Sequence, residues 1–417
     1  MPDDKPAPAP AIKKIKSTGP MRQLMGDYFK ELDEAASTGS AKVAWCTSVG
    51  PAELLRAFGF RVYFPENHGA LLGTSRMAAD LIPASNAIGY SPEICSYLTS
   101  DVGSYLSKST PLTKAFGMQS VPKPDLLAFN TNQCRDVKDW LAFYQREFSV
   151  PLVGIETNRN VGALTDDIVR DLAGQHRALI PALEQVSGVT FDIDRLRETM
   201  ASSYRCTLLW KRVLRAAEAL PAPLTFFDGT IHMGPAVVLR GDRRAEAYYE
   251  GLAAELEQRV AEGVGAVDGE AHRFYWDGMP VWGKLRGHAE LFASHRVCVV
   301  ASTYCNSWIF EDLGRWDDPF EAMARAYTEL FIVRDEDFKE RYLRGMFADY
   351  KIDGVIYHDA KTCPNNSNNR YGMPQRLLAA HNIPYVVING DLNDLRLYSE
   401  EQAVTQFEAL VEQLQEG

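Results

Sequence analysis

Three of the seven cysteines in this chain, Cys95, Cys134 and Cys363, stand where the local sequence would place a reactive thiol. Each follows the signal of a strand end or a helix start, and open parallel sheets bind ligands in the crevice outside their strand ends. Three thiolates that converge in such a crevice can hold three corners of a [4Fe–4S] cluster and leave the fourth iron open. Their spacings match no local ferredoxin or zinc-ribbon pattern, so buried structural thiols are the competing interpretation.

Two of these cysteines share the same local setting. The stretch 354–357 is apolar and β-branched, which predicts a short buried strand, and Cys363 lies in the polar loop that follows it. The stretch 126–130 predicts another strand, and Cys134 lies in the turn beyond its end. Both thiols are therefore expected at the carboxyl edge of a parallel sheet.

Cys95 lies beside a helix start instead of a strand end. Ser91, Pro92 and Glu93 supply a capping hydroxyl, a proline and an acidic group, which is the usual chemistry at the beginning of a helix. This pattern predicts that Cys95 lies in the first helical turn. The positive end of the helix dipole favours a thiolate at that position.

The rest of the chain has the alternating pattern that would position such loops. Near the N-terminus a strand, a helix and a second strand follow one another over 42–48, 51–57 and 61–64, which is typical of a parallel α/β unit. We predict an α/β fold of two Rossmann-like or flavodoxin-like parallel-sheet halves joined by a mainly helical segment. The expected ranges are a disordered tail over 1–20, a first α/β domain over 21–160, a mainly helical connection over 161–290 and a second α/β domain over 291–417.

Composition and charge narrow the function classes. The 417 residues carry 44 Lys and Arg against 55 Asp and Glu, a formal net charge of −11, which argues against a broad nucleic-acid-binding surface. No apolar run approaches the roughly 18 residues of a membrane helix, and the Pro-, Ala- and Lys-rich start has no signal-peptide core. We therefore expect a cytoplasmic protein with reduced cysteines, no membrane partner and no nucleic-acid partner.

A phosphate-binding motif is incomplete in this chain. Residues 278–284 have the Gly-x-x-x-x-Gly-Lys spacing, but Leu285 takes the place of the Ser or Thr that binds magnesium. In addition, Pro280 removes a backbone donor from the loop. If ATP is used, a partner protein is expected to bind it.

Longer motifs around the three cysteines resemble those of one protein family. They read Gly-Tyr-Ser-Pro-Glu-Ile-Cys95-Ser-Tyr, Pro-Asp-Leu-Leu-Ala-Phe-Asn-Thr-Asn-Gln-Cys134 and His-Asp-Ala-Lys-Thr-Cys363, followed by Ile383-Pro-Tyr-Val-Val-Ile-Asn-Gly-Asp391. Together they resemble the benzoyl-CoA reductase and 2-hydroxyacyl-CoA dehydratase family. Within that family, the stretches Ser187-Gly-Val-Thr-Phe-Asp-Ile-Asp-Arg-Leu-Arg and Ala245-Glu-Ala-Tyr-Tyr-Glu-Gly-Leu-Ala-Ala-Glu-Leu-Glu-Gln-Arg are most similar to catalytic-core subunits of ATP-dependent benzoyl-CoA reductase. The resemblance covers nearly the whole chain beyond the N-terminal tail.

The resemblance implies an oxygen-sensitive iron–sulfur enzyme that works in a complex. Cys95, Cys134 and Cys363 would be the cluster ligands, and a homologous sister subunit would complete the enzyme. An ATP-hydrolysing iron–sulfur activator, supplied indirectly by ferredoxin, would deliver low-potential electrons one at a time. The implied activity is reduction of an aromatic acyl-CoA thioester to a cyclic diene acyl-CoA. The alternatives are an (R)-2-hydroxyacyl-CoA dehydratase, in which the electron forms a ketyl radical that expels the hydroxyl group, and a non-catalytic cluster-holding or scaffold subunit.

Five further residues are weaker candidates for the same site. Cys46 lies at the end of a predicted strand and Cys305 lies just after another, and a larger double-cubane cluster of the kind known in relatives would use such extra thiolates. Spare buried thiols are the alternative for both. His358 is a candidate proton donor, with a hydrogen-bonded structural histidine as the alternative. Tyr304 and Ser307 flank one of these cysteines and are candidates for contact with substrate or cluster, against ordinary loop packing.

Overall fold

The computed structural model describes residues 12–315 and 317–416, which form two four-stranded parallel sheets among helices. The first sheet has the strand order β2-β1-β3-β4, with β1 (Val43–Cys46), β2 (Arg61–Tyr63), β3 (Leu126–Asn130) and β4 (Leu152–Ile155). The second has the order β6-β5-β7-β8, with β5 (His272–Asp277), β6 (Val297–Ala301), β7 (Gly354–Ala360) and β8 (Tyr385–Gly390). The predicted fold class, an α/β fold of two parallel-sheet halves, is confirmed.

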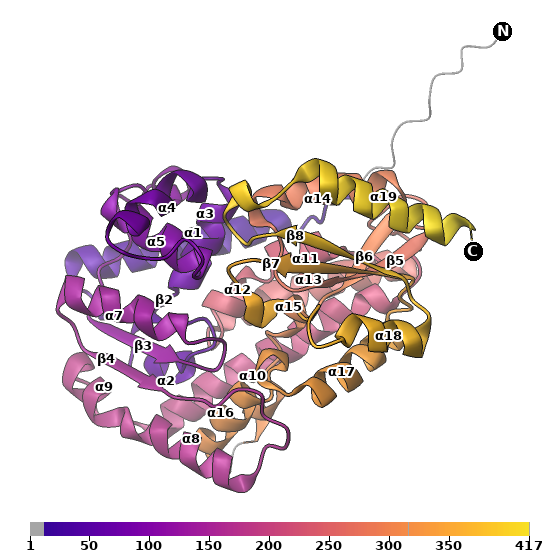
Figure 1. Ribbon diagram of the computed structural model, residues 1–417. Helices are drawn as coiled ribbons and strands as arrows, with labels where there is room; N and C mark the ends of the chain where they lie inside the picture. Colours follow the sequence, from indigo (N-terminus) through magenta and orange to yellow (C-terminus); the bar gives the residue numbers. More distant parts are fainter. Residues whose placement is uncertain (1–11, 316, 417) are drawn as a thin grey trace.

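The helices fall into three groups along the chain (Figure 1). Around the first sheet are α1 (Thr18–Thr38), α2 (Ala52–Ala57), α3 (Pro65–Thr74), α4 (Ala78–Ala87), α5 (Ser96–Leu106), α6 (Pro111–Phe116) and α7 (Asp136–Phe148). Between the sheets in sequence are α8 (Asp166–Ala178), α9 (Ile180–Ser187), α10 (Ile193–Arg215), α11 (Phe226–His232), α12 (Gly234–Val238) and α13 (Arg243–Ala261). The second half adds α14 (Leu285–Ser294), α15 (Thr303–Asn306), α16 (Pro319–Thr328), α17 (Glu336–Asp349), α18 (Met373–His381) and α19 (Glu400–Glu416). Across the described residues, no helix combines the length and the apolar character needed to cross a bilayer.

Strands β1, β3 and β6 are mostly apolar because helices cover the sheets on both sides. Every residue of β1, β3 and β6 is buried. This is the expected pattern for parallel strands, whose crossover helices lie on the faces of the sheet. The long helices between the halves begin at local signals: Asp192 caps α10, and Thr225 with Asp228 forms a capping box at α11.

One central strand, β5, lies inside the range that we expected to be a helical connection. Its sequence includes Arg273, a charged residue that interrupts the apolar pattern of a buried strand. The fold satisfies this guanidinium with the carbonyl oxygens of Tyr350 and Ala219, at 2.7 and 3.0 Å, and with the Glu270 carboxylate at 2.6 Å. The second sheet therefore begins at β5, before residue 291. A charged residue can lie within this buried strand because its guanidinium is hydrogen-bonded to carbonyl groups from distant parts of the chain.

The expected disordered tail over 1–20 differs from the structure in its second part. Residues 1–11 lie outside the described residues, whereas Ile12 forms an isolated bridge with Val267. The backbone N–H groups of Lys16 and Ser17 donate to the Glu255 carboxylate at 2.7 and 2.9 Å, and α1 begins one residue later. The segment from residue 12 onward is thus fixed by contacts with α13, which is far away in sequence.

Candidate functional site

A cavity of about 590 Å³ lies where loops from the two halves meet. Its walls contain residues that directly follow strands of both sheets: Ser48 after β1, Glu66 after β2, Cys134 after β3, Met279 after β5, Tyr304 after β6, Cys363 after β7 and Leu392 after β8. The cavity therefore occupies the crevice outside the carboxyl ends of the strands, the place where open α/β sheets bind ligands. Its size is that of a small-molecule site.

The three cysteines singled out from the sequence all line this cavity. Cys95, Cys134 and Cys363 are free thiols with half-buried side chains. Burial raises the pKa of the Cys95 thiol well above its usual range, and negative charge on Cys134 and Cys363 raises it further. Charge effects of this kind weaken with distance, and all three cysteines border the same cavity. The structure thus brings together thiols that are separated by long stretches of sequence.

The local position of Cys95 differs from the expectation. Helix α5 begins at Ser96, so Cys95 is the N-cap residue and does not lie within the first helical turn. The residues before it form a turn and do not extend the helix. The functional consequence is the same, because the N–H groups at a helix start point toward the cap residue.

The donor set around these thiols fits an iron–sulfur cluster. Backbone N–H groups of Leu98 and Asn366 donate to the Cys95 and Cys363 thiols, respectively. The N–H groups of residues 136 and 137 donate to Cys134, whose pKa is nevertheless raised by burial to about 12. Such N–H···S contacts stabilise thiolates that a cluster would deprotonate.

The arrangement does not resemble a site for one metal ion. Among the residues that the structure describes, no group of three or more His, Cys, Asp and Glu side chains could hold a single ion. The ligands of a cluster bind different iron atoms and therefore lie further apart than the ligands of one ion.

A cation that we did not predict lies beside the thiols. Burial lowers the pKa of the Arg159 guanidinium, while negative charge on Cys134 and Cys363 raises it. Within the described part of the chain, no carboxylate pairs with Arg159 and its Nε has no hydrogen-bond partner. Arg159 is thus near enough to these thiols to interact with them electrostatically, although it does not line the cavity.

The other two cysteine candidates do not reach this cavity. Cys46 is fully buried at the end of β1, and a Cβ atom on Gly50 would lie 2.7 Å from its sulfur. Cys305 is also buried, and its sulfur faces Gly229 of α11. Neither side chain lines the wall that carries the three half-buried thiols. The structure places both in the packed interior.

Of the three remaining candidates, one is buried away from the cavity and two line it. His358 is fully buried in β7, its Nδ1 lies 2.6 Å from the Met279 carbonyl oxygen, and it does not line the cavity. Tyr304 and Ser307 do line it. The Ser307 hydroxyl donates to the Thr303 carbonyl oxygen at 2.8 Å, so it is already engaged within its own helical turn.

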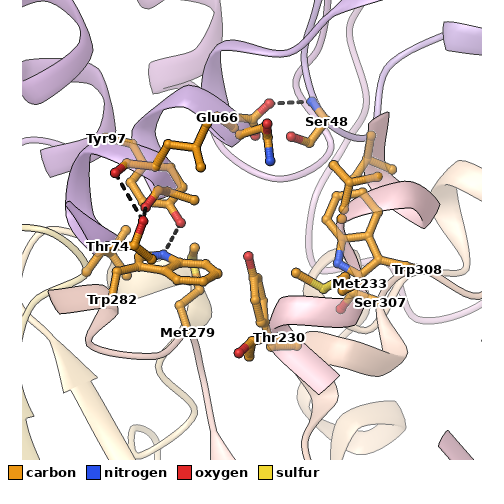
Figure 2. A pocket seen from close by; sticks show the side chains of 18 of the residues that line it. Ser48, Glu66, Thr74, Tyr97, Thr230, Met233, Met279, Trp282, Ser307 and Trp308 are labelled. Carbon is orange, nitrogen blue, oxygen red and sulfur yellow. Dashed lines mark hydrogen bonds between the residues drawn. The ribbon is translucent and has the colours of Figure 1, made fainter. Parts of the chain in front are cut away.

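An aromatic hydrogen-bond chain leads to Tyr304. The Trp282 indole N–H donates to the Tyr97 hydroxyl, and the Tyr97 hydroxyl donates in turn to that of Tyr304. Burial raises the pKa of the Tyr304 phenol, so this hydroxyl stays protonated at neutral pH. Figure 2 shows Tyr97 and Trp282 on one side of the cavity, with Met233 and Trp308 on the opposite side.

Glu66 is the residue that sequence reasoning missed. It lies in the first turn of α3, lines the cavity and accepts a hydrogen bond from the Ser48 backbone N–H (Figure 2). Burial raises the pKa of its carboxyl group to about 7, although the hydrogen bonds from Ser48 oppose the shift. An acidic residue in a first helical turn is common, so the sequence carries no signal that separates this glutamate from others.

The fold and the cavity define an α/β protein of two parallel-sheet halves that presents three thiols and a proton-carrying carboxyl group to one ligand site. The chain belongs to the 2-hydroxyglutaryl-CoA dehydratase D-component family, whose sequence model matches residues 47–414. It is 28% identical to the alpha subunit of lactoyl-CoA dehydratase from Anaerotignum propionicum, covering 94% of this chain and 96% of the relative. It is 27% identical to the (R)-2-hydroxyisocaproyl-CoA dehydratase alpha subunit of Clostridioides difficile, covering 95% of each. It is 26% identical to one of the subunits of benzoyl-CoA reductase from Thauera aromatica, covering 98% of this chain and 97% of the relative.

Proposed function

We propose that this chain is the iron–sulfur catalytic-core subunit of an ATP-dependent benzoyl-CoA reductase. In this proposal Cys95, Cys134 and Cys363 hold a [4Fe–4S] cluster at the wall of the cavity. The observation that carries the proposal is that these three free thiols and Glu66 line one apolar cavity between the two halves. When bound, the cluster supplies single low-potential electrons to the thioester-activated acyl group.

The chain's own residues orient the acyl-CoA and control protons. The apolar walls exclude water, which strengthens every polar interaction inside the cavity. Glu66 is suited to hold a proton at neutral pH, because its pKa of about 7 lies near the working pH of a general acid. Tyr304 keeps its proton and can donate a hydrogen bond to the thioester. Reduction of an aromatic ring to the diene needs two electrons and two protons, and Glu66 is the proton donor that we propose for this reaction.

A dehydratase is the second candidate, and two of the three relatives described above carry that name. The same carboxyl group serves this reaction as a base, because a group with a pKa of about 7 also accepts a proton readily. In that case the electron passed to the 2-hydroxyacyl thioester returns after the hydroxyl group leaves as water. The two candidates therefore differ in electrons consumed: two per product for the reductase and none for the dehydratase.

The proposal includes partners. Each of the three relatives is named as one subunit of its enzyme, which agrees with a homologous sister subunit for this chain. The electrons come from an ATP-hydrolysing iron–sulfur activator protein, which ferredoxin supplies. A non-catalytic scaffold or relay subunit would hold a cluster without binding an acyl-CoA beside it, so ligand binding to this chain separates that alternative from a catalytic role.

Iron and acid-labile sulfide per chain, measured in anaerobically purified protein, test the cluster assignment. We expect about four irons, lost in Cys363→Ala and retained in Cys46→Ala and Cys305→Ala, since the last two thiols do not line the cavity. About eight irons that fall in either control variant would instead move those thiols into the ligand set. A chain without iron under strictly anaerobic handling would contradict the proposal.

The reaction class is tested by counting electrons. The complex, reduced by a limiting amount of donor, is offered benzoyl-CoA or an (R)-2-hydroxyacyl-CoA. Product that stops at one diene for every two electrons supports the reductase. Many turnovers of the hydroxyacyl-CoA for each electron supplied would support the dehydratase and contradict the reductase.

A further inference from the structure

Few charged side chains line the cavity, and the positively charged one lies at its rim whereas the carboxyl groups lie deeper. Among the residues that the structure describes they are Arg22, Glu66 and Asp136. Arg22 is exposed on α1, so it belongs to the rim and not to the interior. Asp136 begins α7 and accepts a hydrogen bond from the Cys95 backbone N–H at 3.4 Å, which places it beside the thiols. Among the described residues that line the cavity, the inner wall therefore carries two carboxyl groups and no cation, since Arg159 is near the thiols but does not line the cavity.

The remaining interior wall is built for an apolar group. Met233, Met279, Trp282 and Trp308 are buried residues that border the space (Figure 2). Methionine adapts to irregular apolar shapes, and tryptophan rings offer broad apolar faces. An uncharged acyl chain or ring would bury its surface against these residues without bringing an unpaired charge of its own into the cavity.

A second carboxylate at the end of the acyl group would be unfavourable in this cavity. It would lose its water, find no cation on the inner wall and face the carboxyl groups of Glu66 and Asp136. Burying an unpaired carboxylate is strongly unfavourable, and a nearby like charge adds to the cost. The CoA phosphates would avoid this problem if they stayed at the rim, where Arg22 is exposed.

We propose that this cavity selects CoA thioesters with an apolar, uncharged acyl group and rejects those whose acyl group ends in a second carboxylate. The inference rests on the proposed acyl-CoA function and names its substrate class. It concerns the wall of the cavity alone, so it holds for either reaction discussed above.

Binding of matched ligands tests the inference. The dissociation constants of pentanoyl-CoA and glutaryl-CoA are compared by anaerobic calorimetry on the intact cluster-loaded protein, and so are those of benzoyl-CoA and 4-carboxybenzoyl-CoA. Each pair shares the CoA moiety and differs in the terminal charge. We expect the uncharged member of each pair to bind at least about a hundredfold more tightly, because an unpaired buried charge costs several kcal/mol.

A variant at the rim makes the test sharper. Arg22 is exposed, so Arg22→Ala is expected to fold normally. If the side chain contacts only the CoA moiety, the substitution weakens both members of a pair by the same factor and leaves their ratio unchanged. Weakening confined to the dicarboxylic ligand would show that Arg22 reaches the second carboxylate, and would overturn the inference.

The possible failures are distinguishable. Equal affinities within each pair would overturn the proposed selectivity while leaving an acyl-CoA site in place. If none of the four thioesters binds more tightly than CoA itself, the proposed acyl-CoA function fails, and the selectivity fails with it.

Discussion

At the scale of single residues, the site combines groups whose ordinary chemistry is changed by burial. Burial raises the pKa of the Glu66 carboxyl group to about 7 and raises the pKa of the Tyr304 phenol. The first group can therefore exchange a proton at neutral pH, whereas the second keeps its proton and acts as a hydrogen-bond donor. The two residues come from different halves of the molecule and meet only at the cavity.

The titration of Glu66 predicts opposite pH profiles for the two candidate reactions. A proton donor works in the protonated form, so the reductase rate should fall as the pH rises above about 7. A base works as the carboxylate, so the dehydratase rate should fall as the pH drops below about 7. The measurement is kcat of the assembled enzyme against pH.

The variant Glu66→Gln is the control for this assignment. It should lower kcat by roughly 10²–10⁴-fold and remove the limb of the pH profile near 7, with little change in acyl-CoA affinity. A variant that keeps the same limb would show that another group titrates.

The positive charge of Arg159 is expected to raise the reduction potential of a cluster bound to the thiols. Adding an electron near a positive charge is favourable, so Arg159→Gln should shift the midpoint potential of the cluster to more negative values. Coulomb interactions near a protein surface suggest a shift on the order of tens of millivolts. Arg159→Lys keeps the charge and should retain most of the potential. Anaerobic redox titration followed by electron paramagnetic resonance measures both. Equal potentials in the wild type and Arg159→Gln would contradict this role.

At the scale of elements, helix α3 approaches the C-terminal half closely beside the cavity. A Cβ atom on Gly73 would lie 2.1 Å from the Asn393 Oδ1 and 2.7 Å from the Trp282 Cβ. The Asn393 amide donates to the Gly69 carbonyl oxygen at 2.8 Å, so the helix and the loop after β8 are held together at this point. A glycine is needed here because no side chain fits between them.

Gly73→Ala should therefore destabilise the protein by about 1–3 kcal/mol, the usual cost of inserting a methyl group into a packed contact. Gly251→Ala is a matched control, since Gly251 also lies within a helix, and nothing stands within 4 Å of its added Cβ. The control should be neutral or stabilising by about 0.5–1 kcal/mol. Denaturant unfolding of both variants compares their free energies of unfolding. Equal values would show that α3 can shift to accommodate the methyl group without losing stability.

At the scale of the whole molecule, the site exists only because two sheets present the same edge to one space. Loops after β1, β2 and β3 face loops after β5, β6, β7 and β8 across the cavity. In Figure 1 the first sheet and its helices lie to one side and the second sheet to the other, with α10 between them. A ligand in the cavity contacts both halves at once.

This arrangement predicts that ligand binding stabilises both halves together. An acyl-CoA at about a hundred times its dissociation constant should add about 2.7 kcal/mol to the stability. Hydrogen exchange should slow in the loop around Ser48 and in the short helix α15 around Tyr304, which follow strands of different sheets. Free CoA, which lacks the acyl group, is the control. Protection confined to one half would place the ligand outside the shared cavity.

The sequence by itself determined the elements that local chemistry controls. The strand predicted over 126–130 matches β3, and the one over 354–357 lies within β7, because a run of apolar and β-branched residues bounded by polar turns has few alternatives. It also indicated two parallel-sheet halves and the loops that carry Cys134 and Cys363. Local pattern was sufficient here, since these features depend on neighbours along the chain.

Tertiary structure decided what depends on distant neighbours. The sequence treats Cys46 and Cys305 much like the other loop cysteines, but packing buries these two and leaves the three others on the cavity wall. Strand β5 was missed because Arg273 is satisfied by carbonyl groups from far along the chain. Glu66 was missed for the same physical reason: its raised pKa depends on burial, and burial is a property of the folded molecule that no local stretch encodes.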